Sequence, residues 1–475
     1  MPRESKELLS RKHAGRVLFG LILVLATTGC AEPTSHRPHV VLVMVDTLRA
    51  DRLGVYGYGR GTTPHLDRWA GDHATVFRDA LATGVWTLPS AASILTGLEV
   101  GQHRVGAGRN RLGEADRPLA QRLREAGYET HGFCEGGPIA AALGFDTGFD
   151  IYECDSFQNF PWQRALARFE ARRADAPLFL FLQMYRVHTP LEARAEWLPF
   201  AGFTGRFGGR FAGRDVGELD YKAIRLGRMR PTREEMAYVS HLYDAAVRRL
   251  DAELGAFLEA LEVSAAGEEL LVIVTSDHGE EFFEHGLVGH GHSLFGELLR
   301  VPLLVRFPDE RRGVEEMPVS TLDIAPTILE AAKLPVPEDF RGRPLGAPGN
   351  DQRVRVAEEA TVGRALQRGS LKWIEIETPG GRQSRLHHLG IDPQERTNLA
   401  ERHPAALASL QRAAEARGSQ APVSAGVLED EPFSAEARRA LEALGYGDRR
   451  PEAEPPPISP TSEGPAGVIG SQPRP

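Results

Sequence analysis

The sequence His39-Val40-Val41-Leu42-Val43-Met44-Val45-Asp46 is an unbroken run of β-branched and apolar residues that ends abruptly in an acid. A run that is apolar on both faces is typical of a parallel strand buried between two layers. Two similar runs follow at residues 177–184 and 270–277, and the latter also ends in an aspartate, Asp277. Residues 301–307 are a candidate for a fourth strand.

Segments with the apolar spacing of helices separate these runs. They lie around residues 66–70, 117–127, 165–174, 234–261 and 320–333. Strands that alternate with helices predict an α/β fold, here a three-layer α/β/α sandwich around a mostly parallel sheet.

The pattern changes to short strands of alternating polarity from about residue 338, with helical patches at 404–417 and 435–444. We therefore expect a main domain over residues 37–337 and a smaller C-terminal α+β subdomain over residues 338–448. Residues 449–475, rich in Pro, Ser, Glu and Gly, are predicted to be a disordered tail.

The N-terminus has the order of an export signal, with basic residues, an apolar run at 17–26 and then Thr-Thr-Gly-Cys at 27–30. Small residues before a lone cysteine resemble a bacterial lipoprotein signal, so residues 1–30 are predicted to end at a lipidated Cys30. This predicts a protein of the bacterial cell envelope, anchored to a membrane and facing the periplasm or the exterior. An uncleaved anchor and simple secretion are the alternatives.

The composition is that of a globular protein, with 475 residues, 41% of them hydrophobic, and a net charge of -9. Because there is no Lys/Arg stripe with interleaved aromatics, nucleic acid is not an expected partner. In an oxidising compartment Cys134 and Cys154 could pair, while two separate buried thiols are the alternative. Residues 202–233, rich in Gly and Arg, are predicted to be a surface loop, with a lid over the site as the alternative.

Three reactive side chains follow the apolar runs: Asp46, Asp277 and, a few residues after the run at 177–184, His188. The carboxyl ends of parallel strands lie along one edge of an open sheet, and ligands bind at that edge. These side chains are therefore expected to converge.

Residues 86–97, Trp-Thr-Leu-Pro-Ser-Ala-Ala-Ser-Ile-Leu-Thr-Gly, predict a loop that delivers a hydroxyl to the start of a helix. Thr87 is a good N-cap and Pro89 is tolerated in a first turn. The exposed N–H groups of such a helix start favour an anion beside the Thr87 hydroxyl.

Asp46, Asp277, His278 and the Thr87 hydroxyl together predict a divalent metal site, for calcium, zinc or manganese. Coordination would lower the pKa of the threonine hydroxyl, which is otherwise a poor nucleophile. Thr87 is accordingly the predicted nucleophile.

The remaining histidines, His188, His290 and His292, are predicted to hold the ester oxygens, to protonate the leaving group or to bind a second metal. Their roles overlap: all three are candidate substrate ligands, and His188 and His292 are also candidate catalytic residues.

Several of these segments occur in the order found in a known family. The sequence resembles the sulfatase family of the alkaline phosphatase superfamily at residues 41–51, 87–97, 275–280 and 300–303, with weaker matches at 323–327 and 386–399. The resemblance implies an α/β/α core, a small C-terminal subdomain and a metal site at the strand ends. It implies that Asp46, Asp277 and His278 are metal ligands, that Thr87 is the nucleophile, and that His188 and His292 or His290 contact the substrate.

The sequence also departs from the usual sulfatase pattern. Thr87 stands where sulfatases have the cysteine or serine that is oxidised to formylglycine, so no formylglycine is expected. Ala91 replaces an arginine, Thr47 replaces a second aspartate, and Val105 stands where a histidine is expected. A threonine nucleophile with an Asp, Asp and His set looks more like the phosphodiesterases and phospho-group transferases of the same superfamily.

The leading hypothesis is a lipid-anchored, metal-dependent hydrolase of sulfate or phosphate-type esters, with a small-molecule, glycan or lipid ester as substrate. A phosphodiesterase or phospho-group transferase of the same superfamily is one alternative. A catalytically silent binding protein with the sulfatase fold is another.

Overall fold

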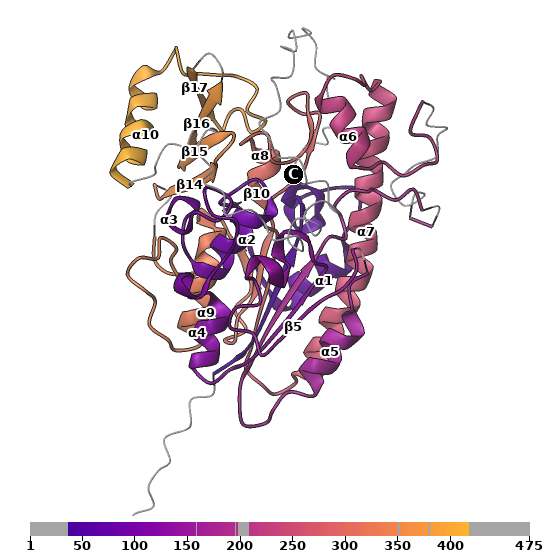
Figure 1. Cartoon of the computed structure of the whole chain (residues 1–475), viewed down its shortest axis with the longest axis vertical. Coiled ribbons are helices and arrows are strands. Elements are labelled where there is room, and N and C mark those ends of the chain that lie inside the picture. Colours follow the sequence, from indigo (N-terminus) through magenta and orange to yellow (C-terminus); the bar gives the residue numbers. More distant parts are fainter. Residues whose placement is uncertain are drawn as a thin grey trace, which may run out of the picture. The chain divides into compact units, whose positions relative to one another are not determined.

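The computed structural model describes residues 37–157, 159–194, 196–197, 209–349, 352–378 and 381–417 (Figure 1). The predicted signal with Cys30, the helical patch at 435–444 and the tail at 449–475 lie outside these residues. Within them, no helix is both long and apolar enough to cross a bilayer.

The central sheet has eight strands in the order β12-β2-β11-β7-β1-β6-β4-β5. Their bounds are β1 His39–Val45, β2 Thr75–Phe77, β4 Glu129–Cys134, β5 Ile151–Cys154, β6 Leu178–Met184, β7 Leu270–Thr275, β11 Leu303–Arg306 and β12 Gly313–Glu315. The five strands from β7 to β5 are parallel, whereas β11 runs antiparallel to both β7 and β2. The sheet is therefore mostly parallel, as predicted.

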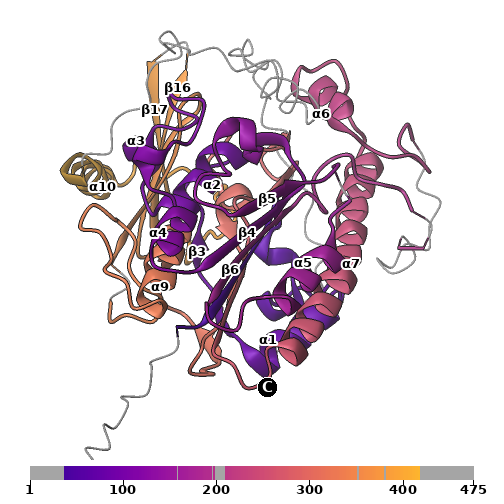
Figure 2. The ribbon, with the colours of Figure 1, turned by 60° about the horizontal axis from the view of Figure 1, so that its bottom comes forward.

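Helices cover both faces of this sheet (Figure 2). Apolar residues of α2, α4 and α9 join one buried cluster with β1 side chains of even number, and those of α1, α5 and α7 join another with the odd-numbered ones. The helices are α1 Pro64–His73, α2 Thr87–Thr96, α3 Val100–His103, α4 Leu119–Glu125, α5 Trp162–Glu170, α6 Glu218–Arg225, α7 Arg233–Ser264, α8 Gly296–Leu299, α9 Ile324–Ala331 and α10 Pro404–Arg417. The α/β/α sandwich is thus confirmed.

Short strands form three smaller sheets. They are β3 Ala80–Leu81 with β10 Arg300–Val301 and β13 Val319–Ser320, the pair β8 Glu281–Phe282 and β9 Val288–Gly289, and the antiparallel sheet β14 Val354–Glu359, β15 Gly363–Arg368, β16 Leu371–Thr378 and β17 Gly381–His388. The last sheet packs with α10 around its own apolar cluster, which contains Trp373. This is the small C-terminal α+β unit that the sequence predicts; its outer bounds, 338 and 448, stay predictions.

Two expectations need correction. The candidate strand at 301–307 is two strands, β10 and β11, because Pro302 has no N–H to give to a ladder. The segment 202–233 is not all loop: it contains the helix α6, which begins with acidic residues that suit a helix N-terminus.

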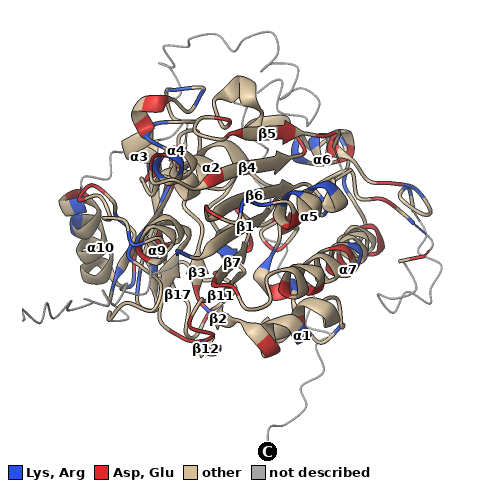
Figure 3. Cartoon of the chain, turned by 90° about the horizontal axis from the view of Figure 1, so that it is seen from below, with Lys and Arg blue, Asp and Glu red and all other residues tan. Residues whose placement is uncertain are grey.

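Charged residues of both signs are interspersed on the helices. In the view from below, α5, α6 and α7 each carry both Lys/Arg and Asp/Glu (Figure 3). The disulfide between Cys134 and Cys154 joins residues that are partners in the register of β4 and β5, which resolves the pairing that the sequence left open.

Candidate active and metal site

The ends of β1, β6 and β7 bring the predicted site residues together. β1 lies between β6 and β7, so Asp46, His188 and the pair Asp277-His278 follow three adjacent strands at one edge of the sheet. All four side chains are buried. The carboxylates reach this edge because Asp46 directly follows β1 and Asp277 comes two residues after the end of β7, and the core holds both apolar strands in place.

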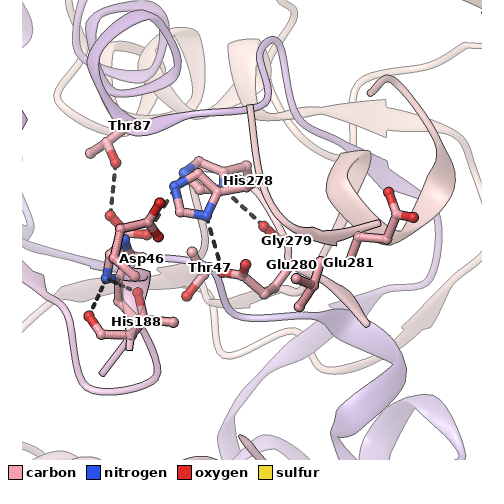
Figure 4. Close-up of polar contacts among 12 residues, drawn as sticks. Asp46, Thr47, Thr87, His188, His278, Gly279, Glu280 and Glu281 are labelled. Carbon is pink, nitrogen blue, oxygen red and sulfur yellow. Dashed lines mark hydrogen bonds and ion pairs between the residues drawn. The ribbon is translucent and has the colours of Figure 1, made fainter. Parts of the chain in front are cut away.

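Thr87 enters the site from the start of α2, and its hydroxyl donates a hydrogen bond to Asp46 Oδ2 across 2.8 Å (Figure 4). The prediction that Thr87 is the N-cap was wrong. Trp86, which has an extended backbone, is the N-cap, and Thr87 is the first helical residue. The Thr87 hydroxyl is thereby directed at a carboxylate instead of at the backbone N–H groups of its own helix.

Asp46, Asp277 and His278 form a group that could hold a metal ion. His278 Nε2 lies 3.7 Å from Asp46 Oδ1 and 3.6 Å from Asp277 Oδ2, and these two buried oxygens have no hydrogen-bond partner among the described residues. His278 Nδ1 lies 2.9 Å from the carbonyl oxygen of Gly279, which can only accept, so Nδ1 carries a proton and Nε2 is the ring nitrogen that faces the carboxylates. The donor set fits a divalent cation.

The electrostatics of the carboxylates support the same conclusion. Burial and the neighbouring charge of Asp277 raise the pKa of Asp46 well above its usual range. Burial raises the pKa of Asp277 to about 7. Two buried carboxylates that disfavour each other's charge gain from a cation bound between them.

His188 and His290 lie beside this group, and His292 is directed elsewhere. The ring centroid of His290 is 4.6 Å from that of His278 and 5.2 Å from that of His188. His292 places Nε2 3.1 Å from Glu281 Oε2 and Nδ1 3.2 Å from the His290 carbonyl oxygen. Between the two candidates left open by the sequence, the geometry favours His290.

His188 is held in one orientation by its own backbone neighbour. Its Nδ1 lies 2.6 Å from the carbonyl oxygen of Thr189, which can only accept, so Nδ1 carries a proton. Burial lowers the pKa of His188 to about 4. The neutral ring is therefore the form that faces the site.

Sequence reasoning missed the groups that fix the turn after Asp46. Thr47 has a φ of +56°, which is unusual for a β-branched residue. Tyr243, on α7, donates to the Thr47 carbonyl oxygen across 2.7 Å and accepts from the Arg49 N–H across 2.9 Å. In the sequence Tyr243 is one of the apolar positions of the predicted helix at 234–261, a position that gives no sign of this contact.

Ser276 makes a second connection, between the two loops that carry the ligands. Its hydroxyl accepts from the Leu48 N–H across 3.0 Å and donates to the His278 carbonyl oxygen across 2.6 Å. The loop after β1 and the loop after β7 are thus tied together behind the site. A serine just before Asp277 gave no sequence signal for this role.

The carboxyl edge of the parallel sheet thus gathers two buried carboxylates, an imidazole and a hydroxyl in one group. Residues 38–334 match the family model described as Sulfatase. The chain belongs to the sulfatase family.

Three relatives share little sequence identity with this chain, but each match covers most of both chains. The chain is 23% identical to an N-acetylgalactosamine-6-O-sulfatase of Bacteroides thetaiotaomicron, over 84% of this chain and 98% of the relative. The solved structure of a 2-O GAG sulfatase is similar with a TM-score of 0.63 and 19% identity, covering 81% of this chain and 92% of that one. A phosphonate monoester hydrolase of Agrobacterium radiobacter gives a TM-score of 0.60 and 21% identity, covering 81% and 96%.

Proposed function

We propose that this chain hydrolyses a phosphate- or phosphonate-type ester, with sulfate esters as the alternative substrate class, and that Thr87 is the nucleophile. The observation that carries the proposal is the hydrogen bond of 2.8 Å from Thr87 Oγ1 to Asp46 Oδ2, within the buried Asp46–Asp277–His278 group. A hydroxyl placed against a carboxylate has an acceptor for its proton and a fixed direction of attack.

Asp46, Asp277 and His278 would hold a divalent cation, for which calcium, zinc and manganese are the candidates. When bound, such a cation supplies Lewis-acid polarisation of the ester oxygens and stabilises an alkoxide. The chain's own residues supply the rest. Thr87 attacks the central atom of the ester from the start of α2, and His188 and His290 contact the oxygens of the same group.

The preference for phosphorus over sulfur follows from the residue at position 87. Threonine offers no route to the formylglycine aldehyde of usual sulfatases. A sulfated threonine would lack the elimination that releases sulfate from a sulfated aldehyde hydrate. A phosphorylated threonine, by contrast, can be hydrolysed by attack of water on phosphorus. Ala91, in place of the arginine of the sulfatase signature, is a second departure from that signature and motivates the alternative of a silent binding protein.

We further propose that the protein is exported and lipid-anchored through Cys30 at the bacterial cell envelope. The Cys134–Cys154 disulfide supports an oxidising compartment. Replacing Cys30 by Ser should abolish labelling by a radioactive fatty acid and release the protein from the membrane fraction, and unchanged labelling would contradict the anchor.

The activity is tested by assaying the signal-less protein, with its bound metal measured, on aryl esters of sulfate, phosphate, phosphate diesters and phosphonate beside Thr87→Ala. We expect turnover of a phosphate or phosphonate ester that the variant lacks. Sulfate ester as the sole good substrate would overturn the phosphoester preference. Transfer of the group to an added sugar or lipid alcohol in place of hydrolysis would favour a transferase. If the protein shows neither bound metal nor turnover, the result would favour a silent binding protein.

A further inference from the structure

The turn between β17 and α10, residues 389–403, has no role in the proposed chemistry. It carries Glu395, whose φ of +52° is uncommon for a residue with a side chain. Two hydrogen bonds tie the turn to β17: Asn398 Oδ1 accepts from the Leu386 N–H across 3.0 Å, and the Leu399 N–H donates to the Leu386 carbonyl oxygen across 2.7 Å. The small C-terminal unit therefore holds the backbone around Glu395 in place.

Glu395 is a buried carboxylate with two partners from different parts of the chain. Its Oε1 lies 2.6 Å from Nζ of Lys372, a buried residue of β16. Its Oε2 accepts from the N–H of Gly296, the first residue of α8, across 2.5 Å. Hydrogen bonds to an ionised carboxylate are stronger than those between neutral groups. Glu395 thus links the small C-terminal sheet firmly to the start of α8.

The residue before Glu395 makes a second contact with the same stretch of chain. The carbonyl oxygen of Gln394 lies 3.1 Å from His285 Nε2. The His285 ring in turn stacks on Phe295, with the ring centroids 3.6 Å apart and the planes at 6°. Residues 285–296, the site loop, are therefore contacted at both ends by two consecutive residues of the C-terminal unit.

The site loop carries His290, whose ring lies 4.6 Å from that of His278 between centroids. Glu281 supports the loop from inside, because its Oε1 accepts from the N–H groups of His285, at 3.1 Å, and Leu287, at 3.2 Å. Held in this way, the loop keeps its own shape. Its place relative to the candidate metal group then depends on what holds its two ends.

The helix α8, which follows the site loop, contacts the segments on either side of the site. The Leu298 carbonyl oxygen accepts from the N–H of Gly279, which directly follows His278, across 2.8 Å. The Leu299 carbonyl oxygen accepts from the N–H of Ala82, on the segment that leads to α2, across 2.8 Å. A shift of α8 would therefore be felt at both segments.

We propose that Glu395 is a positioning residue: it holds the start of α8 and thereby the place of His290. The inference rests on the proposed function in one respect, that His290 contacts the substrate. Without the carboxylate, the Gly296 N–H loses its acceptor and Lys372 loses its counter-charge, so α8 and the site loop are free to shift. A displacement of about 1 Å in a group that orients a substrate can lower turnover about 10²-fold.

The test compares Glu395→Ala with Glu395→Gln. Both variants leave Lys372 without its counter-charge, but the glutamine keeps an oxygen that can accept from the Gly296 N–H. The matched control is Glu375→Gln, which removes a carboxylate from the same sheet. Glu375 Oε1 lies 2.9 Å from Arg364 Nη2, on the neighbouring strand β15.

Two quantities are measured for each variant: hydrogen exchange of the peptide covering residues 285–299, by mass spectrometry, and kcat of the metal-loaded protein on its best aryl ester. We expect Glu395→Ala to exchange faster in this peptide and to lose about 10²-fold in kcat. Glu395→Gln should recover part of both losses. Glu375→Gln should keep the wild-type values of both.

Unchanged exchange of this peptide in Glu395→Ala would overturn the inference. Equal kcat values in the two variants at position 395, or an equal loss in Glu375→Gln, would also overturn it. If the single variants do not fold, the same comparison is made with Lys372→Met added to each, which removes the unpaired buried charge.

The exchange measurement needs no substrate, so it separates this inference from the proposed function. If Thr87→Ala keeps wild-type turnover while Glu395→Ala shows faster exchange and lower kcat, the role of Glu395 stands and the nucleophile assignment fails. If Thr87→Ala is inactive while Glu395→Ala behaves as the wild-type protein, the nucleophile stands and the role of Glu395 fails.

Discussion

Thr87 and Asp46, which are 41 residues apart in the sequence, are joined by a hydrogen bond of 2.8 Å between two buried side chains. One comes from the start of α2 and the other from the end of β1, so the contact depends on how the helix packs on the sheet. The hydroxyl is held beside the group that could bind a metal before any substrate arrives. This pre-arrangement is the basis for regarding Thr87 as the nucleophile.

Removal of metal should both inactivate and destabilise the protein. A cation that binds only the folded state adds about 2.7 kcal/mol to the free energy of unfolding at a hundredfold excess over its Kd. We therefore expect dialysis against a chelator to lower the Tm and abolish turnover, and added divalent cation to restore both. Asp277→Ala should lack this response. A Tm unchanged by chelator, in a protein shown to contain metal before dialysis, would contradict the assignment.

Tyr243→Phe should weaken metal binding without unfolding the protein, because the lost hydroxyl supports the Thr47 turn directly after Asp46. Outer partners of metal ligands typically contribute about 10- to 100-fold in affinity, so a rise in metal Kd of about tenfold is expected. The matched control is Tyr238→Phe on the same helix, whose hydroxyl accepts from the Gly213 N–H. The metal Kd of each variant is measured by titration calorimetry. Equal values in the two variants would show that the Tyr243 hydroxyl does not support metal binding.

His103 should make the fold sensitive to acid. Burial lowers its pKa to about 3, and its ring contacts the Ser93 hydroxyl through Nε2 and the Val105 N–H through Nδ1, which fixes a neutral ring. The unfolded chain binds a proton at this residue below its ordinary pKa of about 6.5 and the folded one does not until about pH 3. The free energy of unfolding should therefore fall as pH drops through this window, by up to about 1.4 kcal/mol per pH unit.

Urea unfolding at pH 7 and pH 5 of the wild-type protein and His103→Asn tests this. The variant is expected to be less stable at pH 7 but to lose less stability on acidification. The same loss in both proteins would mean that another group causes it.

Reduction of the disulfide should destabilise the sheet edge formed by β4 and β5. Cys134 and Cys154 are 20 residues apart, and closing a loop of that size contributes about 3 kcal/mol in the chain-entropy account. Cys134→Ser with Cys154→Ser should lower the unfolding free energy by about that amount and make it insensitive to reductant. A wild-type protein whose unfolding midpoint is unchanged by reductant, with thiols shown to be free, would contradict this.

Much of the fold was predictable because the central strands are unbroken runs of apolar residues. An unbroken apolar run that stops at Asp46 or Asp277 states both that the strand is buried and where it ends. The order of the strands in the sheet was not predicted, because an apolar run does not indicate which other strand it pairs with. The strand direction of β11 was not accessible in this way, since an apolar run reads alike in both directions.

The sequence could predict only those site residues that lie within a few positions of the end of an apolar strand. Nothing in the spacing separates His290 from His292, because the choice depends on which carboxylate each ring meets. Tyr243 contacts a carbonyl 196 residues away, so its apolar surroundings on α7 concealed its hydroxyl. Cys134 and Cys154 are neighbours only through the register of β4 and β5.

The claim that Thr87 is the nucleophile is tested most directly by looking for a covalent intermediate on this residue. The metal-loaded protein is mixed with its best aryl ester, quenched in acid during turnover, digested and analysed by mass spectrometry. We predict that the peptide containing Thr87 gains the mass of the transferred phosphoryl, phosphonyl or sulfuryl group at Thr87 and that Thr87→Ala shows neither adduct nor turnover. Turnover by Thr87→Ala at the wild-type rate, or an adduct on another residue, would contradict the account.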